Sequence, residues 1–247
     1  MSVGHHTEEL FRQDAYLFQC PATVLAVNDR GGIILDRTVF YPTGGGQPGD
    51  SGVLILPDGS EIAIATTVKD RETGEIVHVP AEGASLPAPG TEVTARIDVE
   101  RRRRLMRVHT AMHIMCALVP FPVTGGQVGE DGGRLDFAIE DASAVDKERL
   151  TEEMNRIIAE NHPVRAVWIT EEELDANPDL VRTMSVKPPR GSGRVRVIEI
   201  GENGCIDRQP CGGTHVMHTS EIGRVQVTKM EKKGRLNRRI RFSLLEP

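Results

Sequence analysis

The amino-acid sequence predicts an α+β protein in two parts: a small antiparallel β-barrel or sandwich over residues 1–95, then helices packed on an antiparallel sheet over residues 96–247. In the first part, short apolar runs are separated by Gly and Pro at strand-like intervals. The second part opens with a long stretch that lacks both residues and repeats its apolar positions with helical spacing. Short β-type runs follow it, which is typical of an α+β arrangement.

Strands of the first part are expected where aliphatic residues gather between turn residues. These runs are residues 22–28, 32–36, 38–42, 52–56, 61–68, 76–80 and 92–98. Among them lies FYPTGGGQPGDSG, residues 40–52, whose consecutive glycines permit a sharp turn or a close approach of the backbone to a ligand. The segment does not have the strand–loop–helix order of a phosphate-binding loop. A tight hairpin connection and a functional loop both remain open.

The second part is expected to contain two helices. The first covers residues 99–119 and ends before Pro120, and the second covers residues 145–161, where apolar residues share one face. Strands are then expected over residues 164–170, 194–200, 224–230 and 238–245. The sequence KKGR supplies the turn between the last two strands.

Composition limits the class of protein. The chain has 247 residues and a net charge of −6, and no apolar run approaches the ~18 residues of a membrane span. The N-terminus lacks the cationic start and apolar stretch of a signal peptide. Few, scattered cysteines argue against a disulfide framework. We therefore expect a cytoplasmic protein without a membrane partner, and the oligomeric state stays open between monomer and weak dimer.

Basic residues are concentrated in three runs, although the protein is acidic overall. The runs are Arg101, Arg102, Arg103, Arg104 and Arg107; Lys187, Arg190, Arg194 and Arg196; and Lys229, Lys232, Lys233, Arg235, Arg238, Arg239 and Arg241. An acidic nucleic-acid-binding protein must gather its basic residues in this way. A phosphate-binding surface and ordinary solvated faces remain alternatives.

Four residues have the pattern of a metal site. His109 and His113 are four residues apart on the predicted first helix, so their side chains lie on the same face. Cys211 and His215 occur in QPCGGTHV, where two glycines free the backbone to bring both side chains together. This nitrogen–sulfur set suits a tetrahedral Zn²⁺ site. The alternative is a buried apolar thiol with satisfied core histidines.

Residues near these four limit the choice of metal ligands and the class of enzyme. Cys116 lies on the same helical stripe as the two histidines and is a rival ligand, although packing beneath the site is the preferred interpretation. Cys205 is interpreted as structural. A zinc peptidase needs Glu directly after its first His or directly before its second, and here these positions are Thr110 and Met112. The peptidase classes are therefore excluded.

The motifs HTAMH, TGGQVGEDGGRLDF and CGGTHV, with the TSEIG that follows, resemble the editing domain of alanyl-tRNA synthetase. The segment FYPTGGGQPGDSG also resembles that family. The likeness runs from about residue 14 to 245, and the chain is similar to the free-standing AlaX proteins of medium length. It implies an N-terminal β-barrel domain with a Gly-rich loop over residues 1–95 and a zinc-binding α+β editing domain over residues 96–247. No class II aminoacylation domain is expected.

The resemblance also implies roles for individual residues. Zinc is held at the positions of His109, His113, Cys211 and His215. Catalytic or pocket roles fall on Thr124 and Gln127, and substrate-binding roles in shaping the pocket fall on Gly44, Gly45, Gly46 and Gln47. Recruitment of tRNA is expected to depend on the basic runs, with Arg238 and Arg239 as substrate-binding residues.

The expected activity is the zinc-assisted deacylation of tRNA(Ala) mischarged with serine, with glycine as an open second substrate. A pocket for alanine rejects serine only by about 10²-fold, because serine merely adds a hydroxyl. A second site that hydrogen-bonds this hydroxyl can reject alanine far more strongly, and the Thr124 hydroxyl suits that purpose. Four protein ligands would close the zinc sphere, so one of them, His215, is expected to loosen during turnover. A non-catalytic zinc-stabilised RNA-binding module and a hydrolase of small esters remain alternatives.

Overall fold

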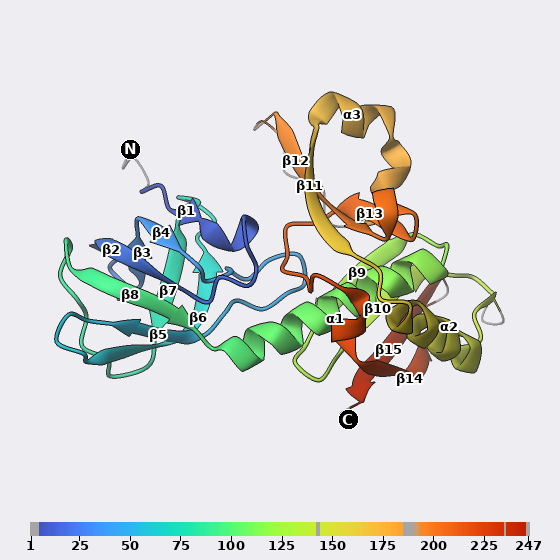
Figure 1. Cartoon of the computed structure of the whole chain (residues 1–247), viewed down its shortest axis with the longest axis horizontal. Coiled ribbons are helices and arrows are strands. Elements are labelled where there is room, and N and C mark those ends of the chain that lie inside the picture. Colours follow the sequence, from blue (N-terminus) through green and yellow to red (C-terminus); the bar gives the residue numbers. More distant parts are fainter. Residues whose placement is uncertain (1–4, 142–143, 185–190, 192, 235, 246–247) are drawn as a thin grey trace. The chain divides into compact units, whose positions relative to one another are not determined.

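The computed structural model describes residues 5–141, 144–184, 191, 193–234 and 236–245 (Figure 1). Strands predominate and two longer helices accompany them, which confirms the predicted α+β class. The chain divides into two compact units, Met1–Arg103 and Arg104–Pro247. The boundary falls within helix α1 (Val99–Leu118), whose first turn belongs to the first unit and whose remainder belongs to the second.

The first unit is a closed antiparallel barrel, so the predicted barrel is confirmed. In order around the barrel, its strands are β2 (Gln19–Val27), β3 (Ile33–Leu35), β7 (Ile76–Pro80), β6 (Glu61–Lys69), β5 (Gly52–Ile55) and β8 (Glu92–Ile97). A short parallel pair, β1 (Glu8–Glu9) and β4 (Arg37–Thr38), and the 3-10 turn η1 (Leu10–Arg12) accompany it.

The barrel closes because apolar residues alternate along its strands. Ile62 and Ile64 of β6 are buried while the residues beside them on the same strand are exposed. Side chains in a strand point alternately to its two faces, so such a pattern fills one interior. The interior is formed by Cys20, Ala22, Val24, Ile33, Leu35, Val39, Phe40, Leu54, Ile62, Ile64, Val93, Ala95 and Ile97.

The Gly-rich segment of the first unit is a tight hairpin turn. Gly44 and Gln47 exchange backbone hydrogen bonds of 3.0 and 2.9 Å. Between them Gly45 and Gly46 have φ values of 57° and 83°, the left-handed conformation that a two-residue hairpin turn requires and that glycine adopts without strain. The Tyr41 hydroxyl donates to the Gly44 carbonyl at 2.9 Å. The three glycines therefore have a structural explanation.

A buried ion pair joins the end of this segment to helix α1. Arg102 and Asp50 are 0% and 1% exposed, and the guanidinium Nε lies 3.1 Å from the carboxylate Oδ2. The guanidinium also donates to the carbonyls of Ala15 and Val39, while the same carboxylate accepts from the Tyr41 amide. Burial of both charges is tolerable because their hydrogen-bonding capacity is used. Arg102 is thus not part of a phosphate-binding surface, in contrast to the expectation for its run.

The described residues of the second unit form two antiparallel sheets. The four-stranded sheet has the order β14 (Arg224–Lys232), β15 (Asn237–Leu245), β10 (Gly132–Ala138) and β9 (Val123–Val128). The three-stranded sheet has the order β11 (Val164–Thr170), β12 (Arg194–Ile200) and β13 (Asp207–Pro210). The helices are the rest of α1, α2 (Lys147–Ala159) and α3 (Glu171–Ala176), with 3-10 turns η3 (Pro178–Leu180), η4 (Glu202–Gly204) and η5 (Thr219–Ile222).

Glycines let α1 pack closely on the four-stranded sheet. A Cβ atom on Gly133 would lie 2.8 Å from the Met112 sulfur, and one on Gly126 would lie 3.2 Å from the Met112 methyl carbon. The sheet therefore has a face covered by α1 and an opposite face. Helix α2 buries Leu150 and Met154 as predicted. Among the described helices, none is long and apolar enough to cross a membrane.

Candidate metal centre

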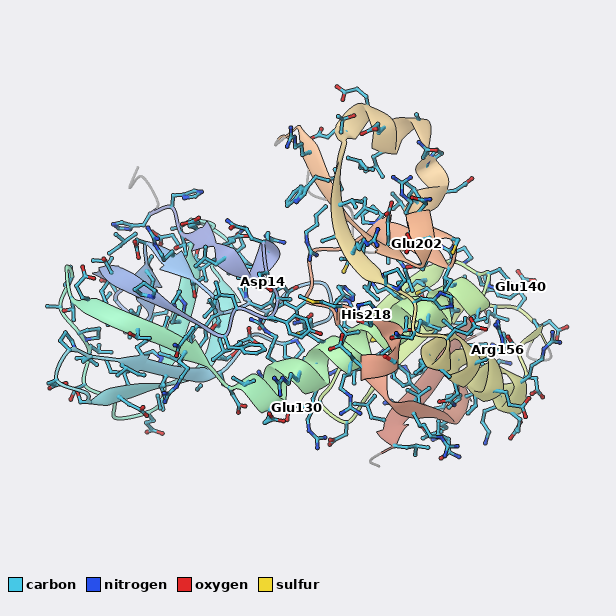
Figure 2. All side chains as sticks on the ribbon, viewed as in Figure 1. Asp14, Glu130, Glu140, Arg156, Glu202 and His218 are labelled. Atoms are coloured by element: carbon cyan, nitrogen blue, oxygen red, sulfur yellow. The ribbon has the colours of Figure 1, made fainter. Side chains whose placement is uncertain are left out.

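Four side chains of the second unit converge at one point. His109 and His113 come from α1, and Cys211 and His215 come from the loop between β13 and η5. One ligand atom from each residue lies within 4.8 Å of every other. The three histidines are 5–6% exposed, whereas Cys211 is half-buried. Figure 2 shows His218 labelled at the start of η5, just after this loop.

The Cys211 thiol contacts two of the histidine rings. Its Sγ is 3.3 Å from His215 Nε2 and 3.6 Å from His109 Nε2. Burial opposes ionisation of the thiol, but the adjacent His109 and His215 rings outweigh burial and hold the Cys211 pKa well below its usual value. A thiolate is the form in which cysteine binds metals.

The loop that carries Cys211 is held by an arginine of the neighbouring strand. The Arg196 guanidinium donates to the carbonyls of Cys211 and Gly213 at 2.8 and 2.9 Å. Arg196 is only 8% exposed. Its basic run predicts a phosphate-binding role, but the guanidinium instead holds the backbone of the loop that carries Cys211.

A hydroxyl on α1 sets the protonation of His215. Thr110 Oγ1 donates its hydrogen to the Met106 carbonyl at 2.9 Å, so at the Nδ1 of His215, 3.1 Å away, it acts as an acceptor. His215 therefore carries its proton on Nδ1 and turns Nε2 toward Cys211. Burial lowers the pKa of His215 well below its usual value, which favours the neutral imidazole that binds metals.

A buried carboxylate performs the same role for His113. Asp207 of β13 is 1% exposed, and its Oδ2 accepts from His113 Nδ1 at 2.9 Å and from Gln209 Nε2 at 2.8 Å. Burial alone would lower the pKa of His113, but the hydrogen bonds with Asp207 and Cys211 raise it to about 10. Asp207 and Cys211 thus favour a positive charge on the His113 ring. A carboxylate–histidine pair of this kind commonly orients a metal ligand.

The donor set and its surroundings fit a metal ion. Three imidazole nitrogens and one sulfur face one another, and partners outside the cluster hold two of the rings. Cys116, the rival ligand, does not belong to the cluster, and burial followed by the charge of Asp207 raises its pKa to about 12. Cys205 is exposed and also lies outside it. The four residues expected from the sequence are therefore brought together.

Comparisons with known proteins identify the family. Residues 195–241, which include Cys211 and His215, match the profile of the threonyl and alanyl tRNA synthetase second additional domain. Residues 17–101 match the profile of class II (A) tRNA synthetases. The alanyl-tRNA editing protein AlaX-M of Methanosarcina acetivorans is 36% identical over 252 residues, which span 97% of this chain and 100% of the relative. The chain belongs to the AlaX family.

Other relatives agree with this membership. AlaX-M of Saccharolobus solfataricus is 34% identical and is aligned over 96% of this chain and 99% of its own length. The alanine–tRNA ligase of Caldivirga maquilingensis is 34% identical over 92% of this chain, but the match covers only 25% of that protein. The AlaX chain is thus similar to one segment of a much longer ligase, and the resemblance predicted from its motifs is confirmed.

Thr124 and Gln127, which the sequence predicts to line an amino-acid pocket, lie on strand β9. The Thr124 hydroxyl is 2.8 Å from Asn237 Oδ1, and Gln127 Oε1 accepts from Arg134 Nε at 3.1 Å. Gln127 and Arg134 also line a surface hollow of about 330 Å³. Arg134 faces away from α1, since its neighbour Gly133 faces that helix. The roles of Thr124 and Gln127 in an amino-acid pocket remain predictions.

The substrate-binding residues expected in the first unit form the hairpin turn described above. Gln47, which follows the three glycines, is 1% exposed. Gly44, Gly45 and Gly46 have the backbone conformation of the turn itself. Their role in shaping an editing pocket remains a prediction.

The two arginines expected to bind tRNA have different environments. Arg238 is 8% exposed, and its guanidinium donates to the carbonyl of Glu140, a residue labelled in Figure 2. Arg239 points to the other face of β15 and makes two hydrogen bonds to Asp136 at 2.7 and 2.8 Å. Three further basic residues of the expected runs, Lys187, Arg190 and Arg235, lie outside the described residues. A role in tRNA binding remains a prediction for both arginines.

Proposed function

We propose that this protein is a trans-editing aminoacyl-tRNA deacylase that removes serine from mischarged tRNA(Ala) with the help of zinc. The observation that supports it most is the three-histidine, one-cysteine cluster in a chain aligned with AlaX-M proteins over nearly the whole length of both. Those relatives are named alanyl-tRNA editing proteins, and editing of this kind is hydrolysis of the ester between amino acid and tRNA.

Zinc is the metal that best suits the donor set. Nitrogen and thiolate ligands in a four-residue set favour a tetrahedral ion of borderline softness, whereas calcium and magnesium prefer oxygen ligands. His109, His113, Cys211 and His215 would hold the ion. When bound, Zn²⁺ supplies Lewis-acid polarisation of an ester carbonyl.

Two of the histidines are held by hydrogen bonds of different strength. His113 is fixed from behind by the charged carboxylate of Asp207, whereas His215 is fixed by the neutral hydroxyl of Thr110. Hydrogen bonds with a charged partner are roughly twice as strong as neutral ones. His215 therefore has the weaker support of the two, which agrees with the expectation that it loosens during turnover.

Selectivity for serine follows from the hydroxyl that distinguishes it from alanine. A pocket that hydrogen-bonds this hydroxyl leaves buried polar groups unpaired when alanine enters, which disfavours alanine strongly. We assign this role to Thr124, whose oxygen retains acceptor capacity beyond the hydrogen that it donates. Glycine also lacks the hydroxyl, so we expect it to be removed more slowly than serine.

The test is to incubate the pure protein with tRNA(Ala) charged with serine, glycine or alanine and to follow the loss of each amino acid. Serine is expected to be released fastest, and alanine roughly 10⁴-fold more slowly. Charged tRNA without protein gives the spontaneous rate. Binding of tRNA with no release above that rate would contradict the proposal and favour a non-catalytic RNA-binding module.

Replacement of Asp207 by Asn tests the support of His113. The variant keeps the shape of the side chain but removes the negative charge behind the ring. We expect zinc affinity to fall roughly 10- to 100-fold, the usual effect of losing a partner outside the coordination sphere. Competition with a chromogenic chelator at fixed pH measures this change.

Glu199→Gln is the matched control for Asp207→Asn. Glu199 lies on the neighbouring strand and pairs with Arg208 at 2.8 Å, outside the metal cluster. This control should keep the zinc affinity of the unaltered protein. An Asp207→Asn protein that binds zinc equally well would show that the carboxylate does not support the ligand.

A further inference from the structure

The single tryptophan of the chain is exposed on an edge strand. Trp168 lies on β11, the outer strand of the three-stranded sheet, and 52% of its surface is accessible. Isolated exposed apolar residues are common, so exposure alone indicates no function. Trp168 also lies on the same face of the sheet as Cys211 of the metal cluster, which suggests a role in binding the substrate.

Trp168 is in line with a residue of the metal cluster across the sheet. It is paired directly with Arg196 of β12. On the other side of Arg196, its carbonyl accepts from the Cys211 amide at 3.1 Å, which continues the pairing of β12 with β13. Residues directly opposite one another in an antiparallel sheet point to the same face. Trp168, Arg196 and Cys211 therefore form one row on one face.

The spacing of strands gives the length of this row. Adjacent strands are about 4.8 Å apart, so the Cα atoms of Trp168 and Cys211 are separated by roughly 10 Å. The indole is thus two strands away from a residue of the metal cluster and on the same side of the sheet.

The opposite face of this sheet is covered, whereas the tryptophan's part of its own face is open. Ile169 and Val195 on the opposite face are buried in a cluster with Leu174 of α3. Ala166 and Thr170 flank Trp168 on its own face, and both are exposed. The indole is therefore accessible on the face of the sheet to which Cys211 belongs.

We propose that Trp168 stacks against the terminal adenine of the tRNA while the aminoacyl ester lies at the metal cluster. This inference rests on the proposed deacylase function. The ester is carried on the ribose of that adenosine, so the base must lie one sugar away from the ester. An exposed aromatic ring roughly 10 Å from the Cys211 Cα is placed to meet it.

The chemistry of the surrounding surface agrees with this occupant. Single-stranded RNA ends are commonly recognised by aromatic side chains that stack on their bases beside arginine side chains. Arg194 is paired with Thr170, which puts its positive charge on the same face two residues from Arg196. A positive charge there attracts the phosphate that precedes the terminal nucleoside. The positive charge of Arg194 would not stabilise an uncharged, apolar partner.

Tryptophan fluorescence reports directly on this contact, because the chain has a single tryptophan. The full-length zinc-loaded protein is titrated with uncharged tRNA(Ala) that ends in CCA and with the same tRNA lacking the terminal adenosine. Stacking predicts strong quenching by the first RNA and little by the second. Equal quenching by both, or none by either, would overturn the proposal.

Kinetics of the Trp168→Ala variant supply a second readout. Loss of one stacked base is expected to raise KM for Ser-tRNA(Ala) about 10- to 100-fold. The value of kcat should stay nearly unchanged, because stacking is present in both ground and transition states. Trp168→Phe should recover most of the loss. Met184→Ala, which removes another exposed apolar side chain of this unit, is the matched control and should alter neither constant.

The outcomes separate this inference from the proposed function. If the unaltered protein deacylates Ser-tRNA(Ala) and Trp168→Ala has the same KM, the stacking role is wrong and the deacylase stands. If the unaltered protein shows no deacylation but its fluorescence is quenched only when the terminal adenosine is present, the deacylase is wrong and the adenine contact stands.

Discussion

Cys211→Ala is expected to abolish serine release from Ser-tRNA(Ala), with a fall in rate of ~10³-fold or more. Cys211 supplies the sulfur of the cluster and lies within 3.6 Å of both His109 and His215, so its removal leaves only three imidazole donors around the site. Bound zinc should fall well below one equivalent. Deacylation kinetics and elemental analysis of the purified protein measure the two effects.

Two further cysteine variants act as controls for this prediction. Cys205 is exposed and lies outside the cluster, so Cys205→Ala should keep both zinc and activity. Cys116 is buried beside the site, and Cys116→Ala should retain zinc even if packing suffers. A Cys211→Ala protein with full zinc content and full activity would refute the assignment. Loss of zinc only in Cys116→Ala would transfer the ligand role to Cys116.

The metal cluster could be predicted because its residues follow local rules. His109 and His113 share a helix face by spacing alone, and the glycines after Cys211 mark a loop that can turn back. Asp207 gave no such signal. It is an acidic residue in a short polar strand, and it becomes a partner of His113 only when β13 packs beside α1. The spacing of residues along the sequence does not show which distant segments come into contact.

Strands β9 and β10 were missed for a related reason. Their sequences, VTGGQV and GGRLDFA, are rich in glycine, which weakens a strand taken by itself. The strands form because Gly126 and Gly133 make room for Met112 of α1, so a tertiary contact outweighs local propensity. The sequence of the Gly-rich turn is compatible with a hairpin or a functional loop, and its backbone geometry is that of a hairpin.

The burial of Arg238 could have been predicted from its position in strand β15, although a charged residue is usually exposed. Arg238 is in phase with Ile240, Phe242 and Leu244 along β15, and all four are buried. Period-two alternation therefore indicated that Arg238 faces inward. Positive charge suggested a surface role, but the phase of the strand decided the direction of the side chain.

Replacement of Asp50 by Ala is expected to lower the free energy of unfolding by about 3–5 kcal/mol, because it leaves Arg102 charged and buried without its carboxylate. Arg102 is 0% exposed and lies in the first turn of α1, so its charge is held away from water. The Tyr41 amide loses its acceptor at the same time. Urea unfolding followed by far-ultraviolet circular dichroism measures the loss, and hydrogen exchange of the barrel strands assigns it to the first unit.

Glu61→Gln is the control, because it breaks an ion pair that is exposed to solvent instead of buried. Glu61 pairs with Arg96 at 2.9 Å on the same barrel, and both side chains are more than 40% exposed. Such a surface pair contributes about 0–1 kcal/mol, so the control should be nearly neutral. If Asp50→Ala lowers the free energy of unfolding no more than this control does, the charge of Arg102 is stabilised by groups other than Asp50. The double variant Asp50→Leu with Arg102→Met should recover much of the stability, because a buried pair removed as a whole leaves no unpaired charge.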